Sequence, residues 1–449
     1  MRRLLTCLTA AAAVLGGLTA NAAPAGAAGA AANGTSGSFS VLSYNVAGLP
    51  EALSSAPTPR ASSTTAIGGR IGAYDVVNVE EDFNYHSNLY AADAHPYRTP
   101  TSGGAGIGSG LNTLSALPYD TDDFERVHWN SCQYDSGDCL TPKGFTFMRE
   151  RLAEGVYVDF YNLHTNAGTN DGDLASRADN LSQLTAFIKT HSAGNAVVVM
   201  GDTNTRYTRS GDTIADFAHD NGLTDAWIQL IRGGTPPAKG SDPLLCDENA
   251  ITNSCEVVDK VLYRGNKLVS LSATSYNNEH AEFLTADGLM LSDHDPITVS
   301  FTWSRNPDFQ LSDQFGGPHG DYFTDIATVP AGGRPVTLSL RGGSRLDGVG
   351  MTLSDGTSLV HGGTGGTASS LTLGSDEYIS SAQLCEGRKG GRTRIFSAKF
   401  TTNLGNSLSG GTATSDCVTR TAPAGWQIAG FHGRSGDEID KLGFIYTKR

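Results

Sequence analysis

Four short apolar runs in the first 200 residues place the strongest constraint on the fold of this chain. They cover residues 39–44, 74–79, 155–161 and 196–200, and each stops close to a polar residue. Runs of this length are typical of strands that are buried on both faces of a sheet. Residues 175–190 have Leu, Phe and Ile at the spacing of an amphipathic helix. Strands that alternate with helices predict an α/β sandwich.

The sequence changes character near residues 303–307, Trp-Ser-Arg-Asn-Pro. Beyond this point the chain is rich in Gly, Ser and Thr, with short alternating segments and little helical pattern. Such a pattern indicates an all-β unit. We therefore expect a boundary at about residue 308, with one domain over residues 38–304 and a second over residues 309–449.

The N-terminus has the pattern of a secretory signal peptide. Arg2 and Arg3 precede an apolar run that is followed by small residues up to Ala23, so residues 1–23 are expected to be removed on export. Residues 24–37 are almost wholly Ala, Gly, Ser and Asn, a composition that predicts a disordered leader. No other apolar stretch reaches the roughly eighteen residues of a membrane helix. The sequence thus predicts a secreted, extracellular protein with no transmembrane anchor.

Six cysteines remain after the predicted signal peptide, and they fall into three local pairs. An even set in an exported chain favours disulfides over metal ligation, although other pairings stay open. No spacing typical of a closed zinc site is present. The pairs are Cys132 with Cys139, Cys246 with Cys255, and Cys385 with Cys417.

The charge balance is acidic, with 32 Lys and Arg against 46 Asp and Glu and a net charge of −14. This balance argues mildly against a protein that binds polyphosphate through bulk electrostatics. A nuclease is still possible, because one bound cation and a few local Arg residues are enough to hold one phosphate.

Polar residues at the ends of the predicted strands are the candidates for chemistry. Side chains beyond strand ends converge on one edge of a sheet, where ligands reach them. Each residue alone is explained by a turn or a solvated surface, but the set is more informative. Its members are Asn45, Glu81, His164, Asp202, Asn204, Asp259, Asp293 and His294.

Six segments of the chain, in order, resemble the endonuclease/exonuclease/phosphatase superfamily over residues 38–303. The resemblance implies a four-layer α/β sandwich like that of deoxyribonuclease I, and hydrolysis of a phosphodiester with a divalent cation. Mg²⁺ is the expected ion, with Ca²⁺ or Mn²⁺ as alternatives. The matching segments are Ser43-Tyr44-Asn45, residues 75–81, Asn162-Leu163-His164-Thr165, Gly201-Asp202-Thr203-Asn204, residues 258–262 and residues 292–296.

The resemblance assigns the metal to Asn45, Glu81 and Asp293, whose oxygen atoms suit a hard cation. The family pattern has Gln-Glu where this chain has Glu80-Glu81. The register of the preceding strand gives Glu81 the metal-binding place and Glu80 the Gln place. Glu80 remains the alternative ligand.

The same resemblance suggests the division of catalytic work. His294 is the expected general base, because imidazole titrates near neutral pH, and Asp259 is expected to orient its ring. Asp202 and Asn204 are expected to position water or phosphate, and His164 to donate a hydrogen bond to the phosphate. Asp293 is expected close to the metal.

The Lys143-Gly144 pair, within residues 139–145, resembles an element of sphingomyelinase-like members and favours a phospholipid substrate such as sphingomyelin. Residues 271–289 are polar and lack the aromatic-tipped hairpin that bacterial sphingomyelinases insert into membranes. Residues 232–255 form an insertion expected to shape substrate access. The alternatives are a secreted deoxyribonuclease or ribonuclease, and a carbohydrate-binding protein whose catalytic fold is inactive.

The run Gly430–Gly443 resembles the closing segment of jacalin-type lectins, which are β-prism proteins, and the resemblance covers residues 309–449. In these lectins a sugar lies against a Gly-x-x-x-Asp loop, which residues 436–440 match. A carboxylate there accepts from sugar hydroxyls, while glycines allow close approach. The resemblance implies glycan binding by Gly317, Asp437, Glu438 and Asp440.

Overall fold

The computed structural model describes residues 34–134 and 137–449. The predicted signal peptide and most of the predicted leader lie outside the described residues. Strand β1 nevertheless begins at Ser36, inside the range 24–37 that the composition gave to a disordered leader. Gly37 pairs with Trp303 in the ladder between β1 and β12, and the indole ring occupies the space that a side chain at residue 37 would need. Among the described residues, no helix has the length and apolar character needed to cross a membrane.

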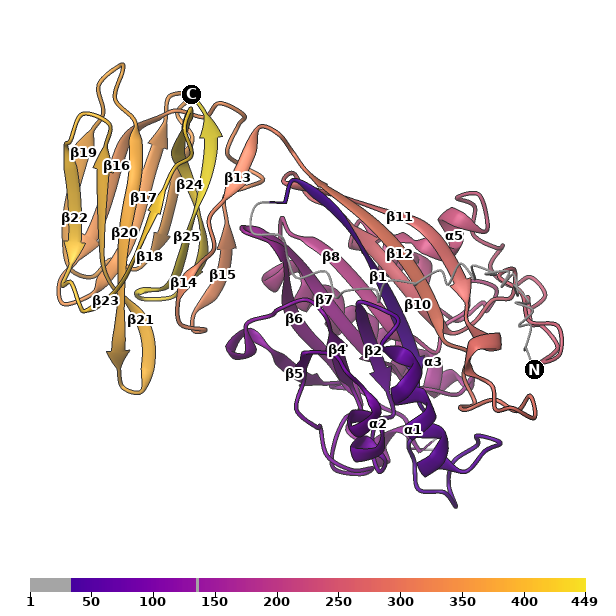
Figure 1. Ribbon diagram of the computed structural model, residues 1–449. Coiled ribbons are helices and arrows are strands. Elements are labelled where there is room, and N and C mark those ends of the chain that lie inside the picture. The colour runs from indigo at the N-terminus through magenta and orange to yellow at the C-terminus, as the bar shows by residue number, and fades with distance from the viewer. Residues whose placement is uncertain (1–33, 135–136) are drawn as a thin grey trace, which may run out of the picture.

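Two six-stranded sheets face each other in the first part of the chain (Figure 1). The first has the order β11-β12-β1-β2-β4-β3 and the second β5-β6-β7-β8-β10-β9. The strands of the first sheet are β1 (Ser36–Asn45), β2 (Val76–Glu80), β3 (Tyr97–Arg98), β4 (Asn112–Ser115), β11 (Val269–Asn278) and β12 (Ile297–Arg305). Those of the second are β5 (Glu125–His128), β6 (Gly144–Ala153), β7 (Val156–His164), β8 (Ala196–Asp202), β9 (Thr224–Asp225) and β10 (Asp259–Arg264).

Helices cover the outer faces of both sheets, which gives the four expected layers. Leu42 and Val77 point outward from the first sheet into a core shared with Ile67 and Leu89. Val41 and Val76 point the other way, into the core between the sheets. The helices are α1 (Arg60–Ile71), α2 (His86–Ala92), α3 (Asp171–His191), α4 (Ile214–Asp220) and α5 (Ala226–Leu230), with short 3-10 turns η1 (Thr121–Asp123), η2 (Asp138–Leu140) and η3 (His280–Phe283).

The apolar runs correspond to β1, β2, β7 and β8, and the helical pattern corresponds to α3. Helix α3 begins four residues before the predicted start of the pattern. Asn170 accepts from the Asp173 amide, and the Asp173 carboxylate accepts from the Asn170 amide, so a capping box fixes its first turn. The helix buries Leu181, Leu184 and Ile188 against the second sheet.

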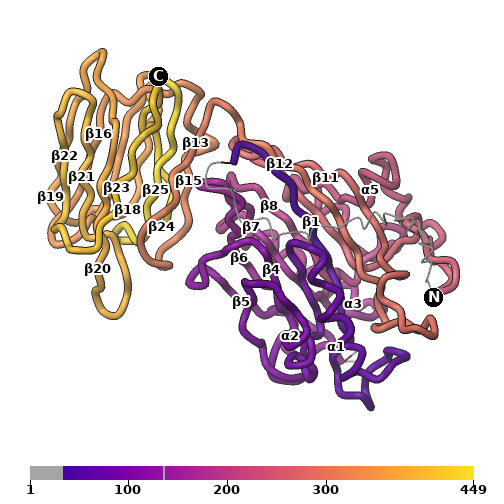
Figure 2. The backbone as a smooth tube through the Cα atoms, viewed as in Figure 1, coloured from indigo at the N-terminus to yellow at the C-terminus, as the bar shows by residue number. Residues whose placement is uncertain are grey.

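Three sheets form the second part of the chain (Figure 2), as expected for a β-prism. Their orders are β13-β25-β24-β15 with β14 beside β25, β18-β17-β16-β19, and β22-β21-β20-β23. Phe400, Phe431 and Phe444 meet between the sheets, with ring centroids 5.5 to 6.4 Å apart. The strands are β13 (Phe309–Leu311), β14 (Phe315–Gly316), β15 (Asp321–Thr324), β16 (Pro335–Gly342), β17 (Leu346–Leu353), β18 (Ser358–Gly362), β19 (Thr367–Thr372), β20 (Ile379–Lys389), β21 (Arg392–Thr402), β22 (Ser407–Gly411), β23 (Asp416–Thr421), β24 (Trp426–Ser435) and β25 (Ile439–Lys448).

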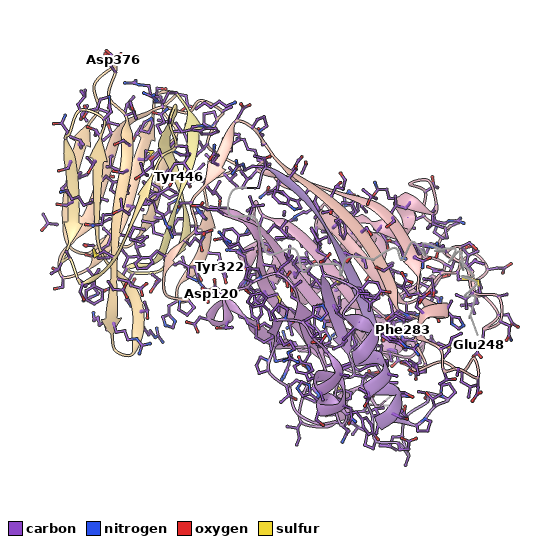
Figure 3. All side chains as sticks on the ribbon, viewed as in Figure 1. Asp120, Glu248, Phe283, Tyr322, Asp376 and Tyr446 are labelled. Atoms are coloured by element: carbon purple, nitrogen blue, oxygen red, sulfur yellow. A yellow bond between two sulfur atoms is a disulfide. The ribbon has the colours of Figure 1, made fainter. Side chains whose placement is uncertain are left out.

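Ion pairs connect the two parts of the chain. Asp123 of η1 is buried and lies 3.1 Å from the Arg434 guanidinium and 2.8 Å from Lys441 Nζ. Lys441 also contacts Asp120 at 2.7 Å. The guanidinium of Arg434 stacks on the Tyr322 ring at 4.0 Å, and Figure 3 places Tyr322 and Asp120 at this junction.

All three predicted cysteine pairs form disulfides, Cys132–Cys139, Cys246–Cys255 and Cys385–Cys417. The last joins β20 to β23, where the two cysteines are direct partners in the ladder.

Candidate active site

The candidate residues lie at one end of both sheets because their strands stop there. Asn45 is the last residue of β1 and pairs with Glu80, the last residue of β2. His164 ends β7 and pairs with Asp202, which ends β8 and also pairs with Asp259, the first residue of β10. Strand register alone thus brings together side chains that are far apart in the sequence.

Two histidines and two aspartates form the centre of this cluster. His294 Nδ1 lies 2.9 Å from Asp259 Oδ2, and its Nε2 lies 3.7 Å from Asp202 Oδ2. His164 Nε2 approaches the same Asp202 oxygen at 3.2 Å. The ligand atoms of Asp202, Asp259 and His294 all lie within 4.8 Å of one another. The ring of His294 is therefore oriented through Nδ1, while its Nε2 lies toward Asp202.

Burial and close charges shift the acidities in this cluster. Burial opposes the charged form of Asp202, but His164 and His294 outweigh it and hold the pKa of Asp202 well below its usual range. Burial also opposes the charged form of His294, yet Asp259 and Asp202 raise its pKa well above its ordinary value. A divalent cation bound beside these groups would counteract the rise.

Asn45, Glu81 and Asp293 lie next to this cluster. The Asn45 amide donates to Glu81 Oε1 at 3.3 Å and to Asp202 Oδ2 at 3.2 Å. Ser292 Oγ donates to the Asn45 carbonyl oxygen at 2.6 Å and lies 3.4 Å from Asp293 Oδ1. Glu81 has a left-handed backbone conformation, with φ of 57°, a strain that proteins retain mainly at functional sites.

The chemistry of these donors fits a hard divalent cation. Carboxylate and amide oxygens from Asn45, Glu81 and Asp293 are the ligand types that Mg²⁺ and Ca²⁺ prefer. The surroundings also carry an excess of acidic groups, and neither side-chain oxygen of buried Glu80 has a hydrogen-bond partner among the described residues. Uncompensated carboxyl groups of this kind favour a bound cation.

Glu80 and Glu81 have different surroundings. Glu80 is fully buried, and burial, reinforced by Asp259 and Asp202, raises its pKa well above the ordinary value. Glu80 takes the place where the superfamily pattern has Gln. Glu81 is partly exposed and points at Asn45, which supports Glu81 as the metal ligand.

Asn204 and Lys143 complete the polar wall of the site. Asn204 has φ of 49°, and its backbone amide donates to Asp202 Oδ1 at 2.9 Å. The Asn204 side chain and Lys143 Nζ both donate to the Thr165 carbonyl oxygen, at 3.3 and 3.4 Å. Lys143 precedes β6 and lies close enough to stabilise the charge of Asp202. The sequence singled out the Lys-Gly pair for its resemblance, but did not place the ammonium group in the site.

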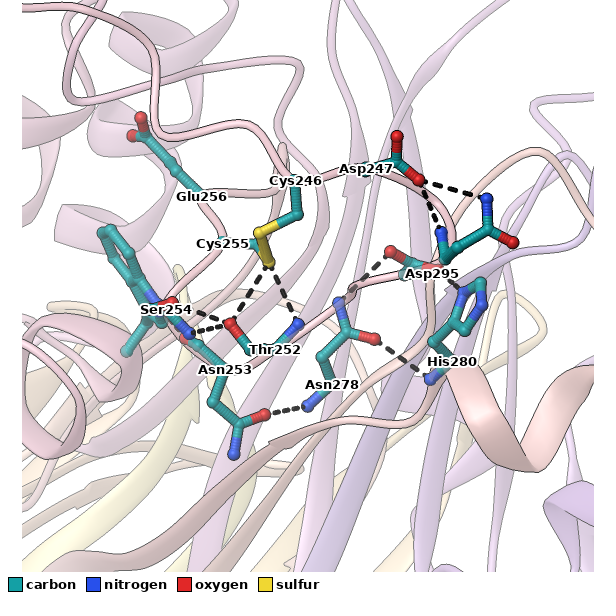
Figure 4. Close-up of a disulfide and its surroundings, with 12 residues drawn as sticks. Cys246, Asp247, Thr252, Asn253, Ser254, Cys255, Glu256, Asn278, His280 and Asp295 are labelled. Carbon is teal, nitrogen blue, oxygen red and sulfur yellow. Dashed lines mark hydrogen bonds and ion pairs between the residues drawn. A yellow bond between two sulfur atoms is a disulfide. The ribbon is translucent and has the colours of Figure 1, made fainter.

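Sequence reasoning missed a hydrogen-bonded brace behind residues 292–296, the candidate catalytic loop that carries His294. The brace consists of Asn253, Asn278, His280 and Asp295. Asn278 N donates to Asn253 Oδ1 at 2.8 Å, and the Asn278 side chain donates to Asp295 Oδ2 at 3.2 Å. His280 Nδ1 lies 2.7 Å from Asp295 Oδ1. Asn253 lies in the loop closed by the Cys246–Cys255 disulfide (Figure 4). The predicted insertion therefore contacts the end of β11, and Asn278 in turn holds Asp295, the residue next to His294. Only the position of Asp295 next to His294 hinted at this role.

The predicted sugar-binding residues meet at a second place, on the prism. Gly317 N donates to the Asp440 carbonyl oxygen at 2.9 Å. A side chain at Gly317 is excluded, because its Cβ would lie 2.2 Å from the Thr393 carbonyl oxygen. Glu438 and Asp440 are buried, whereas Asp437 is exposed. The structure thus brings three of the four residues into direct proximity and leaves Asp437 on the rim.

Comparison with known proteins identifies both parts of the chain. Residues 65–240 match the model of endonuclease/exonuclease/phosphatase family 2, and residues 312–445 match that of the jacalin-like lectin domain. Sphingomyelinases from Mycobacterium bovis and Mycobacterium tuberculosis are each 43% identical over 273 residues, which is 59% of this chain and 53% of theirs. The chain thus spans about half the length of these curated relatives.

Horcolin from Hordeum vulgare is 28% identical over 137 residues, which is 29% of this chain and 92% of horcolin. Among solved structures, sphingomyelinase C from Streptomyces griseocarneus is 19% identical, with 59% of this chain and 99% of that chain covered and a TM-score of 0.39. The chain carries a domain of the endonuclease/exonuclease/phosphatase superfamily followed by a jacalin-like lectin domain.

Proposed function

We propose that this protein is a secreted, divalent-metal-dependent phosphodiesterase that hydrolyses sphingomyelin or a related phospholipid and is brought to surfaces by its lectin domain. The arrangement of His294 between Asp259 and Asp202 carries the proposal, at 2.9 and 3.7 Å. It provides an imidazole that is oriented through Nδ1 and whose Nε2 is the proposed acceptor of a proton from the attacking water.

The described residues divide the work of hydrolysis as follows. Asp259 holds the His294 ring, so that Nε2 accepts a proton from the attacking water. His164, Asn204 and Lys143 supply donors for the charge that develops on the phosphate oxygens. Asn45, Glu81 and Asp293 would hold a divalent cation, which would supply positive charge to offset that of the phosphate.

Three observations favour a phospholipid over a nucleic acid. The net charge of −14 disfavours a nucleic acid bound through bulk electrostatics. Lys143 of the Lys-Gly element, which pairs with Asp138, lies close enough to Asp202 to lower the pKa of that carboxyl group, and the relatives that are 43% identical are named sphingomyelinases. The three disulfides suit an oxidising, extracellular location.

The lectin domain adds a second binding event. Gly317, Glu438 and Asp440 lie on two adjacent loops where glycan contacts are expected. Weak glycan binding raises the local enzyme concentration at a surface, and so raises the rate there without any new contact in the active site.

The test compares the purified mature protein, with Mg²⁺, on sphingomyelin liposomes and on supercoiled plasmid. His294→Ala is the active-site variant, and His219→Ala, whose side chain is 89% exposed on α4, is the matched control. Phosphocholine release that disappears only in His294→Ala supports the proposal. Plasmid nicking with the same dependence makes the protein a nuclease instead. Inactivity on both substrates favours a carbohydrate-binding protein with an inactive catalytic fold.

A further inference from the structure

A two-stranded ribbon projects beyond its own sheet in the lectin domain. Strands β20 and β21 pair with each other along their full length, from residue 379 to residue 402. Their neighbours stop earlier, because β23 pairs only with residues 381–386 and β22 only with residues 397–401. Residues 387–394 therefore form an arm that extends past the sheet, as Figure 2 shows.

A two-residue turn closes the arm. Gly390 and Gly391 both have positive φ, 60° and 81°, which matches the tight hairpin turns that suit the twist of paired strands. Lys389 and Arg392 are direct partners on either side of this turn. The arm thus presents its charged residues on a short hairpin tip of defined geometry.

The arm is strongly basic in an acidic protein. Four of the seven residues from 388 to 394 are cationic, whereas the whole chain has a net charge of −14. Arg388, Lys389 and Arg392 are exposed, and Arg394 is partly buried at the base. A cluster of cationic side chains in a protein of net negative charge favours the binding of an anionic ligand at that cluster.

The arm also forms one wall of the predicted sugar site. The Thr393 carbonyl oxygen lies against Gly317. Arg394 Nη1 lies 3.1 Å from Glu438 Oε2 and 3.2 Å from Asp440 Oδ1, and Lys389 Nζ lies 3.6 Å from Glu438 Oε1. Arg345 holds Glu438 through two hydrogen bonds from the opposite side. The cationic side chains of the arm therefore lie directly beside the loops where a glycan is expected.

These ion pairs change which ligand groups the predicted sugar site can bind. A sugar hydroxyl would donate to Asp440, but that carboxylate is only 1% exposed and already faces a guanidinium. The ends of Arg388, Lys389 and Arg392 remain accessible to solvent. Guanidinium groups match the planar, two-oxygen geometry of carboxylates and bind sulfate in a similar way.

We propose that the basic arm makes this lectin domain a receptor for acidic polysaccharides, which carry carboxylate or sulfate groups. The inference rests on the glycan-binding part of the proposed function and specifies the ligand class. A glycan fits better than a bilayer because residues 387–394 contain no apolar side chain that could enter a membrane. The arm binds the acidic groups while the adjacent loops contact the sugar ring.

The test measures binding of the full-length protein to immobilised heparin and to neutral mannan at about 0.15 M salt. The arm variant combines Arg388→Ala, Lys389→Ala and Arg392→Ala. The control variant combines Lys399→Ala, Lys448→Ala and Arg449→Ala, which removes the same charge from exposed positions elsewhere on the domain. The arm variant is expected to bind heparin about tenfold or more weakly than the wild type and the control. Heparin binding by the wild type should weaken as salt increases.

The outcomes separate this inference from the proposed function. Equal heparin binding by the arm variant and the wild type would overturn the role of the arm. Binding to mannan but not to heparin would overturn the acidic ligand and keep glycan binding. Binding to phosphatidylserine vesicles but to neither polysaccharide would identify a membrane, and not a glycan, as the ligand of the arm. Binding to none of the three probes refutes both the arm proposal and glycan targeting, and phosphocholine release from detergent-dispersed sphingomyelin tests the catalytic proposal independently.

Discussion

Asn253 Oδ1 accepts a hydrogen bond from the backbone amide of Asn278 at 2.8 Å, and this contact joins the disulfide loop to the strand beside the catalytic loop. Asn278 in turn holds Asp295, the neighbour of His294. The covalent link between Cys246 and Cys255 therefore restricts a segment that supports His294, the proposed general base (Figure 4). Restriction of this kind preserves the geometry that catalysis requires.

The first prediction concerns this brace. Replacing Cys246 and Cys255 together by Ser should lower kcat for sphingomyelin by about tenfold, because the support of Asp295 loosens and His294 samples unproductive orientations. Asn253→Ala, which removes the acceptor and keeps the disulfide, should lower kcat in the same direction. The measurement is steady-state phosphocholine release with circular dichroism as the check of folding.

The matched control for the brace is the disulfide of the lectin domain. Replacing Cys385 and Cys417 by Ser removes a disulfide far from the active site, and kcat on dispersed substrate should then stay within about twofold. An equal loss of activity in both disulfide variants would mean that the effect is one of general stability and not of positioning.

The second prediction separates the two adjacent glutamates. Glu81→Gln should weaken Mg²⁺ binding by about tenfold or more, because it removes a charged oxygen ligand. Glu80→Gln should leave Mg²⁺ affinity within a few-fold of the wild type, because burial disfavours the charged form of Glu80 by raising its pKa, and Gln has a similar shape. Calorimetric titration of the two variants with Mg²⁺ distinguishes them. The reverse ranking would assign the metal to Glu80.

The third prediction concerns Glu150 of β6, whose side chain is fully buried away from the candidate site. Burial raises the pKa of Glu150 from 4.5 to about 8. Between these values the folded chain keeps this proton and the unfolded chain releases it, so this group makes folding less favourable as pH rises from about 5 to 8. Glu150→Gln should remove this dependence and gain up to a few kcal/mol at pH 8 relative to the wild type.

Urea unfolding at pH 5 and pH 8 measures this effect. The exposed Glu248→Gln serves as the control (Figure 3), because its side chain projects from the loop surface. A Glu150→Gln variant with the same difference between the two pH values as the wild type would show that Glu150 is charged in the folded protein.

The sequence placed the candidate residues at strand ends, and the structure brings these strand ends together by register. Each apolar run ends beside its functional residue, so the strand that buries Val79 also brings Glu80 and Glu81 to the edge of the sheet. The same reasoning gave the disulfides, whose cysteines are neighbours in the sequence or the ladder.

No sequence pattern predicted the contacts between segments that lie far apart in the chain. Arg394 meets Asp440 only because β21 lies beside the loop that carries Asp440, and no local pattern links the two residues. The same holds for Asp123 and Lys441, which are 318 residues apart. Charged residues of this kind are indistinguishable from solvated surface until the packing of two sheets or two domains is known.

The last prediction concerns the junction of the two domains. Asp123 is 3% exposed and forms ion pairs with Arg434 and Lys441, which are 8% and 4% exposed. Asp123→Ala leaves two buried cations without this anion, and removal of one partner from a buried ion pair costs about 3 to 5 kcal/mol. Asp308→Ala removes a pair with Lys448 at 3.0 Å whose side chains are about half exposed, and such pairs contribute about 0 to 1 kcal/mol. Thermal unfolding and limited proteolysis near residues 305–309 should therefore show a large effect for Asp123→Ala and almost none for Asp308→Ala. Equal and small effects would mean that packing around Tyr322, and not the buried ion pairs, holds the domains together.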